Sequence, residues 1–479
     1  MSQKTYTGLL CTLSLSVCII SASCAKGSTT ADTTVSDIKI RLAQNEAAAT
    51  DRVVEIQMDI DGFNDLDYLR VVKETDYGRL PAKHGKAVLS DRFTYVYQIK
   101  ETDPEHLTLE FTAFDASGRS SKTESVRIIN EVQAAAKFMT LSNLQCVSRV
   151  TGAEDNGHNG LPSVKYTLNN RTDLKYNVGA TDLGIVWEMS QNKFGLVFGD
   201  TYGADFKPNF SAPGPNGGSW RSNVLLFSND TDLSNGLQIN GAATDGGQAK
   251  EICFSAHNTS GTGDFTSIPT AAIHANNADY IHYMNIKTWT GWVTNYSSLY
   301  KSTDEGNNWE RLSGVNFAGE SNFGQCGYYN DNGLVYMMAT KTGRSDKPHL
   351  ARFDEKDIEN TDKYEFWNGF GWVEGREAAA APLFDDKVGE LSFSYMPELK
   401  KWVLLYFNET RYEISLRYSE NPVGPWSDPM QVASGRDWPQ LYGSFIHPLS
   451  RNGTTLYFIM SMWLPYNTYL MSIDLKESK

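Results

Sequence analysis

The sequence has few cysteines, an excess of acidic over basic residues, and no long hydrophobic run beyond its first 23 residues. There are six cysteines in 479 residues, and only Cys146, Cys253 and Cys326 follow residue 24. These three are far apart and show no C-x-x-C spacing, so they allow at most one disulfide and disfavour a zinc site. We therefore expect neither a disulfide framework nor a metal centre built on cysteine.

The charge balance excludes one class of partner. The chain carries 43 basic and 57 acidic residues, a formal net charge of −14, whereas proteins that bind nucleic acid present basic patches to the phosphates. A neutral polymer such as a polysaccharide is compatible with this acidity. No segment after the first 23 residues reaches 18 apolar positions, so any membrane attachment has to come from a lipid.

The first residues resemble an export signal. Lys4 precedes a mostly apolar stretch that is too short and too rich in serine for a membrane span, which predicts a signal peptide over 1–23. Small residues stand directly before Cys24, as in a bacterial lipobox, so we expect Cys24 to be lipidated and 24–36 to be a tether. Ordinary signal-peptidase cleavage nearby is the alternative. The expectation is an exported bacterial lipoprotein, in the periplasm or at the outer membrane or cell surface.

Residues 37–133 alternate apolar and polar positions over short runs such as 53–58 and 107–111, with turns between them. This pattern predicts a small β-sandwich. Its ending, 111–119, looks like the last hairpin of immunoglobulin-like modules in secreted bacterial proteins. We expect an immunoglobulin-like spacer or interaction domain without catalysis.

The composition changes from residue 138 onward, where glycine and tryptophan become more frequent and one unit recurs. A strand ends in an apolar-x-Ser/Asp tag followed by a polar turn, at intervals of roughly 50–75 residues, as in repeat architectures. The tags are at 227–230, 300–304, 352–354, 417–419 and 470–474. Five tags predict a five-bladed β-propeller over 138–479, so the predicted fold class is all-β. The turn at 302–309 also matches the Asp-box of sialidase-like propellers, in which Asp304 is structural.

One hairpin carries two carboxylates. Apolar runs at 183–189 and 194–198 flank the polar turn 190–193, which places Asp182 and Asp200 opposite each other at the open end. Cross-strand neighbours have Cβ atoms about 4.5–5.5 Å apart. Two carboxylates this close cannot both ionise freely, so one pKa rises, which is the arrangement that glycosidases use. The alternative is that both side chains only satisfy turn and backbone hydrogen bonds.

A series of motifs extends this hypothesis: T-D-L-G and F-G-D-T-Y-G around the carboxylates, and further motifs at 220–224, 417–426, 442–448 and 463–471. Over about 138–479 the sequence resembles a bacterial family long described as a domain of unknown function and later recognised as endo-D-arabinanases. Those five-bladed glycoside hydrolases cut α-D-arabinofuranosyl linkages in arabinogalactan and lipoarabinomannan. The resemblance implies that Asp182 and Asp200 are the catalytic carboxylates and that the partner is a D-arabinan polysaccharide.

The roles of the two carboxylates follow in part. We assign Asp182 as nucleophile or base and Asp200 as general acid. A short separation would mean a nucleophile and retention of configuration, whereas a wider gap would mean inversion, and the sequence leaves both open.

Other residues are candidates for binding the substrate because they are polar or aromatic and stand in these motifs. They are Trp220, Arg221, His447, Trp463, Tyr466 and Asn467. The structural alternatives are packing within the blades for the tryptophans, Tyr466 and Asn467, a surface position for Arg221, and a buried place in a strand for His447. Glu390, at the start of a predicted inner strand, is a candidate third carboxylate.

Two other functions stay open: a non-catalytic glycan-binding surface protein, and a propeller glycosidase of another specificity. A sialidase needs an arginine triad, and Arg221 has no obvious partners for one. An L-arabinanase or xylosidase would place three carboxylates on separate blades. We expect a monomer that needs no cofactor, with a structural pore metal such as calcium left open.

Overall fold

The structure is a computed structural model that describes residues 38–49, 53–62, 66–73, 76–79, 92–99, 103, 106–130, 139–152, 163–168, 170–206 and 218–477. The predicted signal peptide, Cys24 and the predicted tether lie outside the described residues and stay predictions. Within the described segments, no helix is both long enough and apolar enough to cross a membrane.

Residues 139–477 contain five antiparallel blades, each built on four strands that follow one another in the sheet. In blade 1 the strands are β10 (Leu183–Ser190), β11 (Lys193–Phe198), β12 (Val224–Ser228) and β13 (Gly241–Ala242), and in blade 2 they are β16 (Thr266–Ala275), β17 (Ala278–Thr288), β18 (Val293–Ser302) and β19 (Glu310–Ala318). Blade 3 has β20 (Gln325–Asp331), β21 (Leu334–Thr340), β22 (His349–Asp354) and β23 (Glu365–Trp367), extended by β24 (Gly371–Glu374). Blade 4 has β25 (Leu391–Met396), β26 (Lys401–Asn408), β27 (Glu413–Ser419) and β28 (Met430–Ser434), and blade 5 has β29 (Leu441–Ile446), β30 (Thr455–Met462), β31 (Asn467–Glu477) and β9 (Met139–Arg149).

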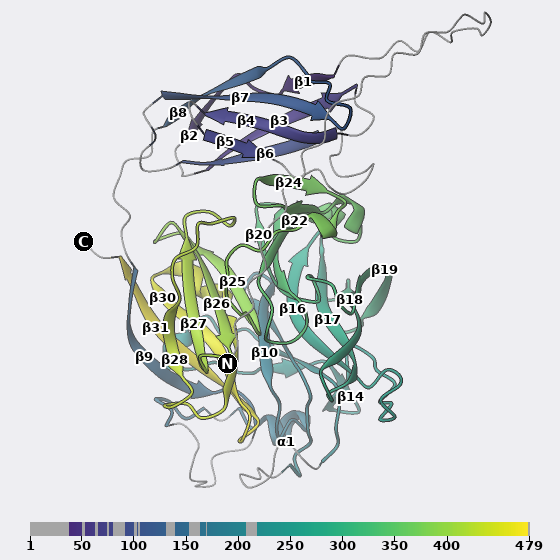
Figure 1. The fold of residues 1–479 in the computed structure, drawn as a ribbon. Helices are drawn as coiled ribbons and strands as arrows, with labels where there is room; N and C mark the ends of the chain where they lie inside the picture. The colour runs from purple at the N-terminus through teal and green to yellow at the C-terminus, as the bar shows by residue number, and fades with distance from the viewer. Residues whose placement is uncertain are drawn as a thin grey trace, which may run out of the picture. The chain divides into compact units, whose positions relative to one another are not determined.

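The blades form a closed ring. Their innermost strands β10, β16, β20, β25 and β29 contact one another in that order, and β29 returns to contact β10. The outermost strand of blade 5 is β9, which precedes blade 1 in sequence and pairs with the last strand, β31 (Figure 1). The two ends of the propeller are thus joined by backbone hydrogen bonds, and the predicted all-β, five-bladed fold is confirmed.

The recurring tag has a structural meaning. The five tags fall on or just after the third strand of successive blades, namely β12, β18, β22, β27 and β31. In the Asp-box after β18, the carboxylate of Asp304 accepts the backbone N–H of Asn308 at 2.8 Å, and Gly306 adopts φ +84°. The indole N–H of Trp309 donates to the carbonyl of Gly306 at 2.9 Å. These contacts close the turn, so Asp304 has the structural role that the motif predicts.

The middle strands of the blades are apolar on both faces because a neighbouring blade covers each face. All eight residues of β26 are buried, in the sequence KWVLLYFN, and the first nine residues of β17 are buried as well. The apolar run 402–407 in β26 is expected for a strand buried on both sides, whereas β17 also buries the polar residues Asp279, His282 and Asn285. The inner and middle strands therefore form a rigid support for the residues at their ends.

The predicted sandwich region also contains two sheets. One includes β1 (Lys39–Leu42), β3 (Val53–Asp61) and β6 (Arg92–Gln98); the other has the order β2 (Glu46–Ala49), β8 (Glu124–Asn130), β7 (His106–Asp115), β4 (Leu66–Lys73) and β5 (Asp76–Arg79). Ile56 and Met58 from the first sheet share one core with Leu69 and Phe111 from the second. The two-sheet arrangement follows the predicted alternation, and the immunoglobulin-like classification stays a prediction. Strand β6 also pairs with β24, a contact that the sequence did not predict.

Candidate active site

A cavity of about 930 Å³ lies at one end of the ring of innermost strands. Most of its lining comes from two places that recur in the blades: the residues at and just before the start of the innermost strands, and the connection between the second and third strands. The connections supply Asp200, Tyr202 and Trp220 in blade 1, Trp289 and Trp292 in blade 2, Arg344 in blade 3, Glu409 and Tyr412 in blade 4, and Trp463 and Tyr466 in blade 5. The lining is therefore scattered over the sequence but regular in the fold.

Asp182 and Asp200 are brought together by the hairpin of β10 and β11. Leu183 pairs with Phe198 in the ladder, and Ala180 and Tyr202 form a further bridge beyond it. The two aspartates lie between these pairs, on opposite strands, as the hairpin pattern predicts. Gly199 lies against the Asp182 carboxylate so closely that a Cβ there would overlap Oδ1. A glycine is thus required at position 199 for Asp182 to occupy its place at the cavity wall.

Asp182 is held by two tyrosines from blade 5. Its Oδ2 accepts the hydroxyl of Tyr442 at 2.8 Å and the hydroxyl of Tyr466 at 3.1 Å, while its buried Oδ1 has no hydrogen-bond partner among the residues that the structure describes. Burial raises the pKa of Asp182 to about 7, and the charge of Glu390 adds to this; the two tyrosine hydrogen bonds oppose the shift. The Asp182 carboxyl can therefore exchange a proton near neutral pH.

Asp200 has a similar pKa for a partly different reason. Burial is the largest cause and the negative charge of Asp182 is the next, and together they raise the pKa of Asp200 to about 7. Its Oδ1 accepts the indole N–H of Trp220 at 2.8 Å and the hydroxyl of Thr266 at 3.1 Å, and both bonds favour the ionised form. Since the charge on Asp182 disfavours a second charge beside it, the pair is poised to hold one proton between two carboxyls.

Glu390 also lines the cavity, directly before the innermost strand of blade 4, and it is paired with an arginine. The guanidinium of Arg344 donates to both carboxylate oxygens, at 2.7 Å from Nη2 and at 3.1 and 3.2 Å from Nε. Arg344 also contacts the ring faces of Trp292, Phe407 and Tyr442, at 5.4, 4.9 and 5.3 Å from the ring centroids. The candidate third carboxylate is thus an ionised partner of Arg344 whose charge acts on Asp182.

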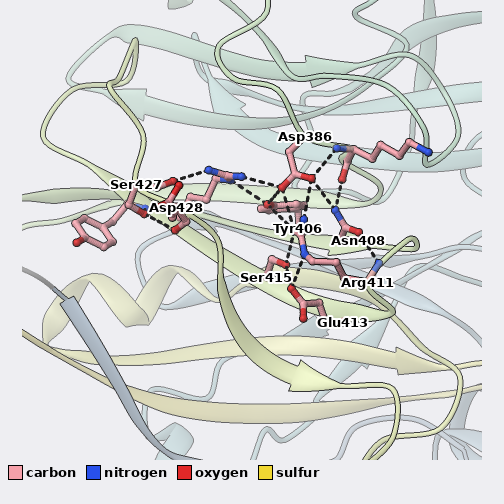
Figure 2. A network of polar contacts seen from close by, with 11 residues as sticks. Asp386, Tyr406, Asn408, Arg411, Glu413, Ser415, Ser427 and Asp428 are labelled. Carbon is pink, nitrogen blue, oxygen red and sulfur yellow. Dashed lines mark hydrogen bonds and ion pairs between the residues drawn. The ribbon is translucent and has the colours of Figure 1, made fainter.

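A polar network in blade 4 fixes the segment that leads to Glu390 (Figure 2). Asp386 accepts two hydrogen bonds from Arg411, both at 2.9 Å, and one from Arg417 at 2.9 Å. Tyr406 and Asn408 donate to the same carboxylate at 2.6 and 3.0 Å. Burial alone would raise the pKa of Asp386, but these donors outweigh it and hold the pKa well below its usual range. The loop before β25 is therefore anchored by a buried, charged carboxylate.

The structure places three of the six predicted substrate-binding residues at the cavity: Trp220, Trp463 and Tyr466. Trp220 and Tyr466 bond the two carboxylates, as described above, and Trp463 is 38% exposed at the rim. The ring of Trp463 meets those of Tyr442 and Tyr466 edge-on, with centroids 6.3 and 5.6 Å apart. These side chains are positioned to contact a ligand beside Asp182.

The other three predicted residues are not among the cavity-lining side chains, and each has a structural contact instead. Arg221 donates to the backbone carbonyls of Ala249 and Asn177, at 2.7 and 2.6 Å. His447 is fully buried, and its Nδ1 accepts the backbone N–H of Leu449 at 3.2 Å. Asn467 is buried and its side chain accepts the hydroxyl of Thr151 at 3.0 Å. All three stabilise the blades, so substrate contact is not the role that their placement supports.

Sequence reasoning missed several residues of the site. Tyr442 belongs to one of the motifs but is not among the predicted site residues. The sequence around Arg344 and around Glu251 has no pattern that indicates a site. Glu251 pairs with His257 at 2.8 Å, and the His257 ring lies 4.4 Å from that of Trp220, which in turn bonds Asp200. The signal that would have found Tyr442 is its place at the start of an innermost strand, which only the fold reveals.

The carboxylates do not form a recognisable metal centre. Among the described residues, no group of three or more histidine, cysteine, aspartate or glutamate side chains is placed to hold a metal ion. Because Cys146, Cys253 and Cys326 are all buried free thiols, they offer no ligand cluster either. The expectation of a cofactor-free protein stays a prediction.

Comparisons with known proteins identify the family. A model described as Domain of unknown function (DUF4185) matches residues 167–472. Notoamide biosynthesis cluster protein J' of Aspergillus versicolor is 31% identical over 309 residues, which cover 60% of this chain and 82% of that protein. Protein J of the same kind of cluster, from Aspergillus sp. (strain MF297-2), is 29% identical over 310 residues, or 60% and 81% of the two chains.

Among solved structures, an exo-β-1,3-galactanase from Phanerochaete chrysosporium is 10% identical with a TM-score of 0.37, over 60% of this chain and 59% of that chain. A xylan β-1,4-xylosidase from Bacillus halodurans is 11% identical with a TM-score of 0.36, over 63% and 54% of the two chains. At this distance the function has to be argued from the site itself. Because the family model matches more than half of the chain, this protein belongs to the family described as Domain of unknown function (DUF4185).

Proposed function

We propose that the protein is a glycoside hydrolase in which Asp182 and Asp200 are the catalytic carboxylates. The observation that carries the proposal is this pair of carboxyls at the wall of one cavity, both with a pKa near 7. Glycosidic bond cleavage needs one protonated and one ionised carboxyl at the same pH. Two acids that titrate near neutrality beside each other meet that need.

The surroundings support different roles for the two carboxyls. Asp182 accepts two tyrosine hydroxyls, which stabilise its ionised form, so it suits the nucleophile or base. The charge on Asp182 raises the pKa of Asp200, so Asp200 keeps its proton and suits the general acid that protonates the leaving oxygen. Asp200 also accepts two hydrogen bonds that favour its ionised form, so the charge of Asp182 is the feature that supports the assignment of Asp200 as the acid.

The charge of the cavity supports an uncharged sugar as substrate. Of the described residues that line it, Arg344 alone is basic, and its guanidinium is already bonded to Glu390 and Glu409. A carboxylate on the substrate would therefore be repelled by Asp182, Asp200 and two glutamates, with no free cationic side chain to pair with it among the described lining residues. This disfavours sialic acids and uronic acids as substrates. We propose α-D-arabinofuranosyl linkages of arabinogalactan and lipoarabinomannan as the target, on the resemblance of the sequence motifs to endo-D-arabinanases.

The test is the release of oligosaccharides from arabinogalactan by purified wild type, Asp182→Asn and Asp200→Asn, with linear L-arabinan and sialyl-lactose as other substrates. We expect the wild type to act on arabinogalactan alone and both variants to lose at least a hundredfold in rate. Exposed Asp437, replaced by Asn, is the matched control and should leave the rate unchanged. Normal turnover in both site variants would refute the assignment.

An aryl α-D-arabinofuranoside with a nitrophenolate leaving group separates the two roles. This leaving group needs little protonation, so Asp200→Asn should lose far less activity on it than on the polymer, whereas Asp182→Asn should lose both. Equal losses on the two substrates would contradict the assignment of Asp200 as the acid. Binding of arabinogalactan without any cleavage by the wild type would instead favour the alternative of a glycan-binding surface protein.

We also propose that the protein is exported and anchored through a lipid on Cys24, with 24–36 as the tether. The support is the small residues before Cys24 and the apolar stretch that precedes them. Metabolic labelling with a radioactive fatty acid should mark the wild type and leave Cys24→Ser unlabelled and released from membranes. Equal labelling of the two proteins would contradict the anchor.

A further inference from the structure

Three exposed aromatic side chains stand around the mouth of the cavity. Trp289, Tyr412 and Trp463 are 39%, 40% and 38% exposed, and all three line the cavity. Large aromatic side chains are usually more buried than this in a folded protein, although a single exposed one needs no explanation. Here the three exceptions occupy equivalent places, since each lies in the connection between the second and third strands of its blade.

Each ring is held by its surroundings rather than left free. Trp289 meets Trp292 edge-on, with centroids 5.0 Å apart and planes at 88°. The ring of Tyr412 lies so close to Gly435 that a Cβ at that position would overlap it, and its hydroxyl accepts the backbone N–H of Gln440. Trp463 is held edge-on by Tyr442 and Tyr466, as described above. Rings fixed in this way lose little conformational entropy when a ligand binds.

The order of the blades places these rings on both sides of the carboxylates. Asp182 and Asp200 belong to blade 1, whose innermost strand contacts those of blade 2 and blade 5. Trp289 belongs to blade 2, on one side. Trp463 belongs to blade 5, on the other side, and Tyr412 belongs to blade 4, the next blade beyond it. A linear ligand that runs from blade 2 to blade 4 by way of blades 1 and 5 would pass one ring, then the carboxylates, then two rings.

We propose that Trp289 and Tyr412 are stacking platforms for sugar rings on opposite sides of the cleavage point, with Trp463 between Tyr412 and the carboxylates. The apolar C–H face of an uncharged sugar ring packs on an aromatic face, and the ring hydroxyls keep their contact with water. This inference rests on the proposed glycosidase function. The proposal places sugar rings of the substrate on both sides of the cleaved bond, which means cleavage within a polysaccharide chain. More sugar rings are bound on the blade 4 side than on the blade 2 side.

The experiment compares Trp289→Ala and Tyr412→Ala with wild type on D-arabinofuranosyl oligosaccharides of increasing length and on arabinogalactan. We expect KM for the polymer to rise about tenfold in each variant, which corresponds to 1.4 kcal/mol of lost binding. The gain in kcat/KM with chain length should stop at a shorter length than in wild type. Trp289→Phe and Tyr412→Phe keep a ring and should recover most of the affinity.

Phe254→Ala is the matched control, because Phe254 is 69% exposed and is not among the cavity-lining residues. Thermal unfolding of every variant shows whether it is folded. Affinity electrophoresis in gels that contain arabinogalactan measures binding apart from cleavage. If wild type cleaves the polymer and both alanine variants match it in KM and in binding, the platforms are refuted while the proposed function stands. If wild type neither binds nor cleaves any of these glycans, both proposals are refuted.

Discussion

The raised pKa of Asp182 has a consequence for stability that can be measured without knowing the substrate. The pKa is about 7 in the folded protein and 3.8 for an ordinary aspartate. An acid with a raised folded pKa keeps its proton in the folded state while the unfolded chain has already lost it. The free energy of unfolding of the wild type therefore falls as the pH rises from about 4 to about 7.

The size of this effect follows from the shift. Three pKa units correspond to about 4 kcal/mol at 1.36 kcal/mol per unit, and contact with water in the cavity makes this an upper limit. Asp182→Asn has the same shape, can still accept from Tyr442 and Tyr466, and cannot ionise. The difference in free energy of unfolding between Asp182→Asn and wild type should thus move in favour of the variant, by up to about 4 kcal/mol, between pH 4 and pH 8.

Urea unfolding at whole pH units from 4 to 8, followed by tryptophan fluorescence, measures this difference. Groups away from the pair titrate alike in both proteins and cancel, whereas the pKa of Asp200 falls in the variant because the charge of Asp182 is gone, which moves the difference in the same direction. Asp437→Asn controls for the loss of an exposed carboxylate. The variant should lose activity while it gains stability at alkaline pH, the trade-off expected of a strained functional site. Stability curves that stay parallel within 1 kcal/mol across this range would refute the physical account of the pair.

Three further predictions test the surroundings of the pair. Trp220→Phe removes a hydrogen bond that lowers the pKa of Asp200, so the alkaline limb of the kcat/KM profile should move to higher pH; a limb that stays in place would contradict the contact. Gly199→Ala should displace the Asp182 carboxylate and lower kcat on the order of a hundredfold, with Tm showing that the protein is folded; full activity would contradict the close approach. Asp386→Asn leaves the buried guanidinium of Arg417 without its anion, while exposed Arg411 keeps its pairing with Glu413, and should cost about 3–5 kcal/mol in urea unfolding at pH 7. Since its pKa is lowered, this loss should shrink below about pH 4, and a loss independent of pH would contradict the charge pairing.

The local sequence is sufficient to predict those parts of the structure that depend on contacts between residues near one another in the chain. The β10–β11 hairpin has a short polar turn between two apolar runs, and its register follows from that turn, so the opposition of Asp182 and Asp200 could be predicted. After β12, β18 and β27 the tag supplies a serine or aspartate whose side chain accepts a backbone N–H of the following turn. These features depend on residues that are near one another in sequence, as in the hairpin that pairs Leu183 with Phe198.

The rest of the site depends on contacts between blades, which local sequence does not specify. Tyr442 bonds Asp182 across 260 positions, and Arg344 reaches Glu390 across 46. In an extended segment, the side chains of two adjacent residues also have different surroundings, since successive side chains point to opposite sides. Trp220 bonds Asp200 while Arg221 turns to backbone carbonyls, and Tyr466 bonds Asp182 while Asn467 is buried among the strands. A shift of one position exchanges a side chain that lines the cavity for one that contacts only the blades.

The pairing of β9 with β31 sets the order in which the protein can be completed during synthesis. Arg149 pairs with Tyr469, so β9 leaves the ribosome more than 300 residues before its partner exists. At 5–20 residues per second this delay is about 15–65 s. For that time the edge of β9 that later pairs with β31 is without its partner strand, and an unpaired edge of this kind can join other chains. The last strand of the propeller to be translated is thus the one that pairs with this edge, and the ring can close only after all five blades have been made.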